Sequence, residues 1–359
     1  MDSAPLKTLF NPLSAGKGSP FTSPLIHLPS IMILDIARHK LYEAFLTLVI
    51  IALATVVGTI STPDTVAMTD AMSAPMGRFI GEFEVAHPIL STILGFLFIV
   101  YLSFIATRST VRSHLYGVNS FAAMTLTPLM IMGLAPQGAM LSTILLSWLV
   151  VEALRRLFFA FGSEERQHAI FSAMLAVGAM PLLDSFMFVA LLATPLILVS
   201  LRCGLREMVI CIVGALLPIF TYAYVTWCGG GGFALALAEP YHNMMAPSML
   251  SVEEYFVLPR MVLMGTMLLA MLLSMVMYFR NRLALTLVAR HIWGFAISTL
   301  IILAVALVVL PSPSAASFVC PAILMSMFAP MFFLRMNTLI AVALYILMIS
   351  SAVAVMGIS

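Results

Sequence analysis

Four ionisable side chains lie within ten positions, just ahead of a long apolar run: Arg78, Glu82, Glu84 and His87. Only 9% of the chain is charged, so such a concentration needs a reason. Two interpretations compete for this stretch. It is either a solvated linker between two membrane spans, with an amphipathic segment, or a reaction site at a membrane surface.

Glu82 and Glu84 are separated by one residue, and their spacing allows two kinds of chemistry. On extended backbone the two carboxylates converge on one divalent cation, which could neutralise a phosphate leaving group. Alternatively, one carboxylate takes a proton from an acceptor hydroxyl. On a regular helix the two side chains diverge, because helical neighbours lie three and four positions apart. Asp64 and Asp70 are the other candidate catalytic acids in this loop.

Arg78 and Arg260 are the candidate side chains for binding an anionic substrate. Arginine presents a planar fork that suits bidentate contacts to phosphate, so the pair could clamp a lipid-linked phosphate. Two other roles stay open for them. Each could extend to lipid headgroups, or could form a structural pair with Glu82, Glu84 or Glu254.

A second polar stretch follows later in the chain. Four glycines, Gly229 to Gly232, predict a hinge, and an apolar segment then leads to a polar turn at Glu239–Asn243. His242 in this turn and His87 in the first stretch complete the candidate substrate-binding residues. The segment is typical of a mobile flap over a site, and equally of a plain linker.

Composition decides the class of protein that must position these residues. Hydrophobic residues make up 62% of 359 positions, and the mean hydropathy is +1.11. Ordinary soluble domains have roughly 45–50%. Lipid must therefore cover much of the surface, which predicts a multi-pass membrane protein. The net charge is only +2 and no basic run occurs, so nucleic acid is excluded as a partner.

Apolar runs of membrane-spanning length predict an all-α transmembrane helix bundle with about 11 spans. A cytoplasmic tail (1–38) precedes a membrane domain (39–359), and the two long outer loops are 61–87 and 228–255. Val66 to Phe83 in the first loop is expected to form a helix along the outer leaflet. The expected spans are 41–60, 88–106, 120–134, 139–154, 169–181, 185–201, 208–227, 256–279, 292–310, 317–334 and 338–356.

Basic residues supply an independent check on this topology. With the N-terminus inside and the spans alternating, fifteen Lys and Arg residues fall on the inner side and only Arg78 and Arg260 on the outer side. Inner loops of membrane proteins carry such an excess. The pattern predicts a bacterial inner-membrane protein with a cytoplasmic N-terminus and a periplasmic C-terminus. On the inner side, Glu152 is expected to pair with Arg155 and Arg156.

The long acidic loop after the first span resembles the GT-C class of membrane glycosyltransferases. The residues that carry the resemblance are Asp64, Asp70 and Glu82-Phe83-Glu84, followed by Leu154-Arg155-Arg156-Leu157-Phe158 after the fourth span. The resemblance implies a sugar donor on a polyprenyl phosphate, used at the outer leaflet. The segment 120–241, with Leu205-Arg206-Glu207 before Gly214 and Pro218, is also similar to uncharacterised multi-spanning proteins of Bacteroidota.

Two further classes of function stay open. A transporter would carry polar groups near the middle of the membrane, where the predicted spans offer mainly Ser and Thr; a lipid flippase does not need them. A non-catalytic membrane subunit of a cell-envelope complex would need none of the outer acids and arginines.

Overall fold

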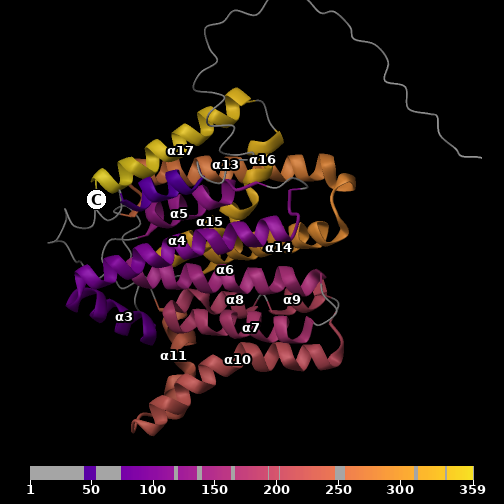
Figure 1. Ribbon diagram of the computed structural model, residues 1–359. Helices are drawn as coiled ribbons and strands as arrows, with labels where there is room; N and C mark the ends of the chain where they lie inside the picture. Colours follow the sequence, from indigo (N-terminus) through magenta and orange to yellow (C-terminus); the bar gives the residue numbers. More distant parts are fainter. Residues whose placement is uncertain are drawn as a thin grey trace, which may run out of the picture.

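The chain folds into helices throughout the part that the computed structural model describes. This part comprises residues 44–53, 74–116, 120–135, 140–162, 166–192, 194–201, 203–246, 255–310, 314–335 and 338–358, and it contains no strand. Figure 1 shows the long helices packed side by side in one bundle. The predicted all-α fold is confirmed.

Short connections join most consecutive helices. A first helical segment, Ala44–Leu53, precedes the labelled elements. In chain order these are α3 (Pro75–Ala86), α4 (Pro88–Arg112), α5 (Ala122–Leu134), α6 (Met140–Gly162), α7 (Arg166–Leu183), η2 (Ser185–Met187), α8 (Phe188–Leu192), α9 (Thr194–Leu201), α10 (Leu205–Cys228), α11 (Phe233–Met245), α13 (Leu258–Asn281), η3 (Arg282–Ala284), α14 (Leu287–Val309), α15 (Ala315–Phe328), α16 (Pro330–Arg335) and α17 (Thr338–Ile358).

Five helical stretches in the described ranges are long and apolar enough to cross a membrane. They are α4, α10, α14, Leu258–Ala284 and Ser317–Arg335, with lengths of 19 to 27 residues. A span needs about 20 apolar residues. These helices also expose large apolar side chains, such as Val209 and Val225 on α10, each about 60% exposed. The fold is therefore compatible with a membrane-embedded protein, while the count of about 11 spans and the orientation stay predictions.

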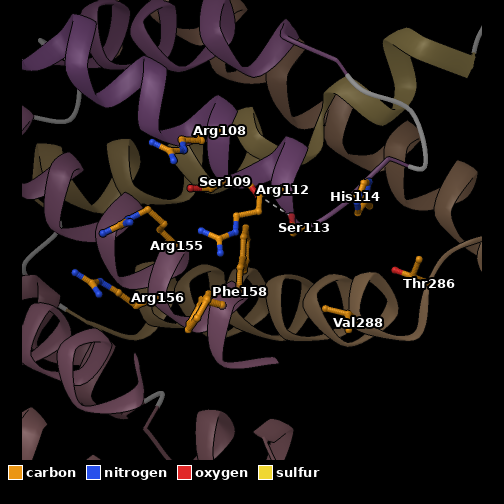
Figure 2. A pocket seen from close by; sticks show the side chains of 11 residues that line it. Arg108, Ser109, Arg112, Ser113, His114, Arg155, Arg156, Phe158, Thr286 and Val288 are labelled. Carbon is orange, nitrogen blue, oxygen red and sulfur yellow. Dashed lines mark hydrogen bonds between the residues drawn. The ribbon is translucent and has the colours of Figure 1, made fainter. Parts of the chain in front are cut away.

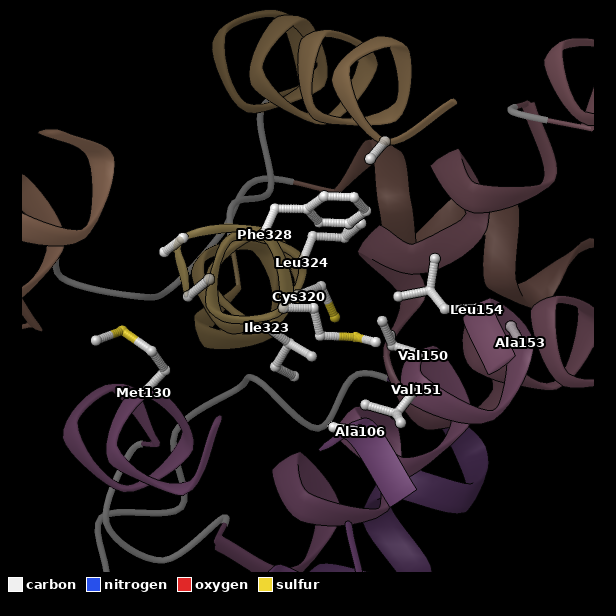
Figure 3. Close-up of a cluster of buried hydrophobic side chains, with 14 of the residues drawn as sticks. Ala106, Met130, Val150, Val151, Ala153, Leu154, Cys320, Ile323, Leu324 and Phe328 are labelled. Atoms are coloured by element: carbon white, nitrogen blue, oxygen red, sulfur yellow. The ribbon is translucent and has the colours of Figure 1, made fainter. Parts of the chain in front are cut away.

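Apolar side chains from several helices fill the interior. Figure 3 shows Ala106 of α4, Met130 of α5, Val151 of α6 and Ile323 of α15 meeting in this cluster. All four are at most 1% exposed. Such close packing fixes how α4 lies against α6, and these two helices carry the arginines of the basic pocket described below.

A buried side chain forms hydrogen bonds with backbone groups at a break between two helices in the interior. α15 ends at Phe328 and α16 begins at Pro330, which leaves a break at Ala329. The Ser274 hydroxyl of α13 donates to the Ala329 carbonyl (3.0 Å) and accepts the Phe332 amide (3.1 Å). A single buried hydroxyl thus serves both sides of the break, as apolar surroundings require.

Small residues bring α7 and α10 into close contact. A Cβ atom placed on Gly178 would lie 2.0 Å from the carbonyl oxygen of Ala215, and Gly214 approaches α7 in the same manner. Small residues are the usual means by which membrane helices approach each other. An ion pair between Arg166 and Glu207 (2.5 Å) also joins these helices.

Both long loops predicted from the sequence contain a helix in the structure, α3 in the first and α11 in the second. The first loop forms a helix, α3, that begins at Pro75 and ends before Pro88; residues 54–73 lie outside the described part. The predicted polar turn at Glu239–Asn243 is wrong, because α11 runs through it. Pro240 removes only one amide from the hydrogen-bond ladder, and the flanking Ala and Met residues favour helix.

Candidate functional site

The two predicted outer loops meet through their helices, α3 and α11. A guanidinium nitrogen of Arg78 lies 3.7 Å from a carboxylate oxygen of Glu239, and the Tyr222 hydroxyl donates to the other oxygen (2.8 Å). Arg78 is 57% exposed. Of the roles considered for this arginine, the structure contains an ion pair with a glutamate, Glu239, which was not among the expected partners. Of those expected partners, Glu254 lies outside the described residues.

Glu82 and Glu84 both lie within α3, so the extended backbone needed for a shared cation is not present. Glu82 is exposed, whereas Glu84 faces the beginning of α6. Its two carboxylate oxygens accept the amides of Met140 (3.1 Å) and Leu141 (3.3 Å). Burial raises the pKa of the Glu84 carboxyl, although these two bonds oppose the shift. Glu84 thus caps α6, because its oxygens accept two amides that have no partner within the helix.

Arg260 is buried near the beginning of α13, with 9% of its surface exposed. Its guanidinium donates to the carbonyls of Tyr255 (3.2 Å) and Ala135 (3.4 Å) and lies 4.8 Å from the centre of the Tyr255 ring. The Tyr255 hydroxyl donates to the Leu134 carbonyl (2.7 Å). Both side chains therefore satisfy the C-terminal end of α5. Within this guanidinium group, Nε alone has no hydrogen-bond partner among the described residues.

The other predicted site residues do not join these contacts. His87 is exposed between α3 and α4, where its ring lies 5.4 Å from Phe83, and His242 is exposed on α11. Asp64 and Asp70 lie outside the described residues, so their catalytic role stays a prediction. Within the described part, no group of three or more His, Cys, Asp or Glu side chains is placed to hold a metal ion.

A strongly basic pocket lies toward the other end of α6, about 22 Å along the helix from the cap formed by Glu84. Its volume is about 550 Å³. Figure 2 shows four guanidinium groups on one side of it, two from the last turns of α4 and two from α6. The lining residues are Arg108, Ser109, Arg112, Ser113, His114, Arg155, Arg156, Phe158, Phe159, Thr286 and Val288.

Charge is left uncompensated in this basic pocket. The predicted pairing of Glu152 is confirmed: its carboxylate accepts from Nε of both Arg155 and Arg156, each at 2.7 Å. Arg112 lies over the Phe159 ring (5.2 Å), and Arg108 has no ion pair or hydrogen bond to any described residue. Four guanidinium groups against one carboxylate leave three positive charges around an open space.

His114 lies at the opposite side of the basic pocket from these guanidinium groups, close to Thr286 and Val288 in the view of Figure 2. It follows α4 with φ of +49°, and no other described non-glycine residue has a positive φ. The Leu115 amide donates to the Thr110 carbonyl (3.2 Å), and the His114 amide donates to the Val111 carbonyl (3.1 Å). This bond pattern is a Schellman helix end, in which the position of His114 is usually glycine.

Sequence reasoning placed these arginines on the inner side but did not predict a pocket. The available signals were the spacing of Arg108 and Arg112, which puts both on one helix face, and the adjacent Arg155 and Arg156. No protein-family model, curated protein or solved structure matches the chain. The basic pocket and the outer-loop contacts are therefore interpreted from their own chemistry.

Proposed function

We propose that the protein is a multi-pass protein of the bacterial inner membrane that binds a phosphate-bearing lipid in the basic pocket. The observation that carries this proposal is the set of four arginines lining one cavity with a single carboxylate among them.

The arrangement of donors supports a phosphate as the bound group. Arginine forks pair with phosphate oxygens through two parallel hydrogen bonds, which are about twice as strong as neutral ones. Arg108 and Arg112 lie on one wall with no carboxylate to occupy them, and Arg155 and Arg156 lie on another. An anion between the walls would relieve the repulsion among these cations.

The surface of α4 supports a lipid over a free anion. Ile93, Leu97, Tyr101 and Phe104 are each 52–57% exposed. Their spacing of three and four residues puts them in one stripe, and the same stripe continues to Arg108 and Arg112. An apolar surface that ends in a pair of arginines is complementary to an acyl chain joined to a phosphate.

The excess of inner basic residues supports placing the pocket at the cytoplasmic leaflet, with the N-terminus inside. A lipid flippase or transporter would use such a site directly. The glycosyltransferase expectation, with a polyprenyl-phosphate sugar at the outer leaflet, rests on Asp64, Asp70, Glu82 and Glu84, and no contact in the described part adds to it.

Thermal unfolding of the detergent-purified protein tests the proposal. Dioctanoyl phosphatidic acid and phosphatidylglycerol are expected to raise the midpoint in a saturable way, since a ligand of the folded state stabilises it. Dioctanoyl phosphatidylcholine, whose headgroup is neutral overall, is expected to have little effect. Arg108→Gln with Arg112→Gln removes charge-assisted hydrogen bonds worth about 1.5–3 kcal/mol each, so affinity should fall by at least tenfold.

Arg280→Gln is the matched control, because Arg280 is exposed on α13 and does not line the pocket. Equal shifts with all three lipids, or an unchanged response in the double variant, would reject the basic pocket as the lipid site. A shift of the same size with inorganic phosphate at the same concentration would instead identify a soluble anion as the ligand.

A further inference from the structure

The basic pocket is larger than its arginines require. A phosphate group has five heavy atoms, whereas cavities of about 300–1,000 Å³ accommodate whole ligands. The volume here is about 550 Å³. The guanidinium groups point to one side in Figure 2, and His114, Thr286 and Val288 line the other. A phosphate held by the arginines therefore leaves a second region of the pocket unfilled.

Among the described residues that line this second region, one polar side chain is free to bind. The Thr286 hydroxyl is occupied, since it accepts the Ala289 amide (3.2 Å) and caps α14. The Ser113 hydroxyl donates to the Ser109 carbonyl (2.8 Å). The His114 ring, by contrast, has no hydrogen bond to any described residue. A neutral imidazole offers one donor and one acceptor, the combination that suits a hydroxyl group.

The backbone gives an independent reason to single out His114. Its φ of +49° is a conformation that favours glycine, and the helix end that it forms is made with glycine in most proteins. A side chain at this position is held against a local preference. Strained residues of this kind cluster at binding sites, where the surrounding structure fixes them.

We propose that His114 binds a hydroxyl-bearing headgroup that extends beyond the lipid phosphate, such as a polyol or sugar in phosphodiester linkage. This inference rests on the proposed function, because it takes the phosphate to be held by the arginines. It names the class of lipid: a phosphodiester whose headgroup has neutral hydroxyls, rather than a terminal phosphate.

The test compares two lipids that differ in this extension. Phosphatidylglycerol carries a glycerol headgroup, and phosphatidic acid ends at its phosphate. Ligand-dependent thermal shifts in detergent give the affinity of each for wild type, His114→Ala and His114→Gly. Both variants should bind dioctanoyl phosphatidylglycerol roughly threefold to tenfold more weakly, the scale of one hydrogen bond, and bind dioctanoyl phosphatidic acid as wild type does.

The two variants also separate backbone from side chain. Without lipid, His114→Gly should unfold at a higher temperature than His114→Ala, because glycine adopts the positive φ freely. His291→Ala is the matched control, since His291 is exposed on α14 and outside the pocket. It should leave both affinities unchanged.

The outcomes distinguish this inference from the proposed function. If wild type binds neither lipid, the proposed function itself fails. If His114→Ala and His114→Gly bind both lipids like wild type, His114 only terminates α4 and the inference is overturned. It is also overturned if the variants weaken both lipids equally, because His114 would then act on the phosphate or on the shape of the pocket.

Discussion

The outer-loop contacts and the basic pocket both place charged side chains at helix ends, yet they treat them differently. The Glu84 carboxylate accepts hydrogen bonds from the first amides of α6, and the Arg260 guanidinium donates to the carbonyls of Ala135 and Tyr255. In the basic pocket, Arg108 and Arg112 end in open space without a carboxylate. Hydrogen-bonding capacity that the fold leaves unused is therefore the better indicator of a site, and a dense group of charges in the sequence is the poorer one.

The largest expected effect is on the activity of a reporter enzyme fused to the protein, because the reporter is either active or silent according to the side of the membrane. A reporter enzyme that is active only in the periplasm is expected to be active when fused after Ser359 and silent when fused after Arg166. The reason is the excess of basic residues on one side of the predicted spans. Reporter activity after Arg166 would put the basic pocket at the outer leaflet. The contacts of α3 and α11 would then lie on the cytoplasmic side.

Arg260→Ala is expected to cause the largest loss of stability among single substitutions. It removes a buried guanidinium and leaves the carbonyls of Ala135 and Tyr255 without their donors, which should lower the free energy of unfolding by about 2–4 kcal/mol. Denaturant unfolding in detergent measures this value. If the variant keeps wild-type stability but loses lipid binding, Arg260 contacts the ligand and its structural role is contradicted.

Glu84→Gln should keep the fold and change its pH dependence. Because burial raises the pKa of Glu84 above its usual 4.5, the folded protein keeps this proton to a higher pH than the unfolded chain. Its contribution to the free energy of unfolding therefore falls as pH rises through that window. Relative to wild type, the Gln variant should gain stability as pH rises above 4.5, as followed by thermal unfolding.

Glu82→Gln supplies the control for Glu84, because Glu82 lies on the same helix but is exposed. Its stability should stay within about 0.5 kcal/mol of wild type at each pH, the usual range for an exposed substitution. Since both variants are expected to stay folded, they also test the catalytic prediction cleanly. A roughly hundredfold loss of transfer from a lipid-linked sugar in the Gln variants would restore the outer loop as a reaction site.

Arg78→Ala is expected to have the smallest effect. The ion pair with Glu239 is 3.7 Å long and more than half exposed on the arginine side, and pairs of this kind contribute about 0–1 kcal/mol. The stability should change by no more than about 0.5 kcal/mol, and less at high salt. A larger loss would show that Arg78 contributes more to the fold than an exposed ion pair does.

Local spacing explains what could be predicted. The pairing of Glu152 follows from its position three and four residues before two arginines of one helix, and the all-helical fold follows from composition. Contacts between distant segments could not be derived in this way. Glu84 caps a helix that begins 56 residues later, and the basic pocket exists only because α4 packs on α6. The end of α4 at His114 carries no glycine to mark its geometry.

The tight seam between α7 and α10 constrains how the protein can change shape. The carbonyl of Ala215 lies so close to Gly178 that even a methyl group has no room there. Packed surfaces of this kind do not slide past each other in small steps, so we expect the two helices to move as one rigid body. If the protein alternates between conformations, the hinge must lie at another seam, and α7 and α10 travel together.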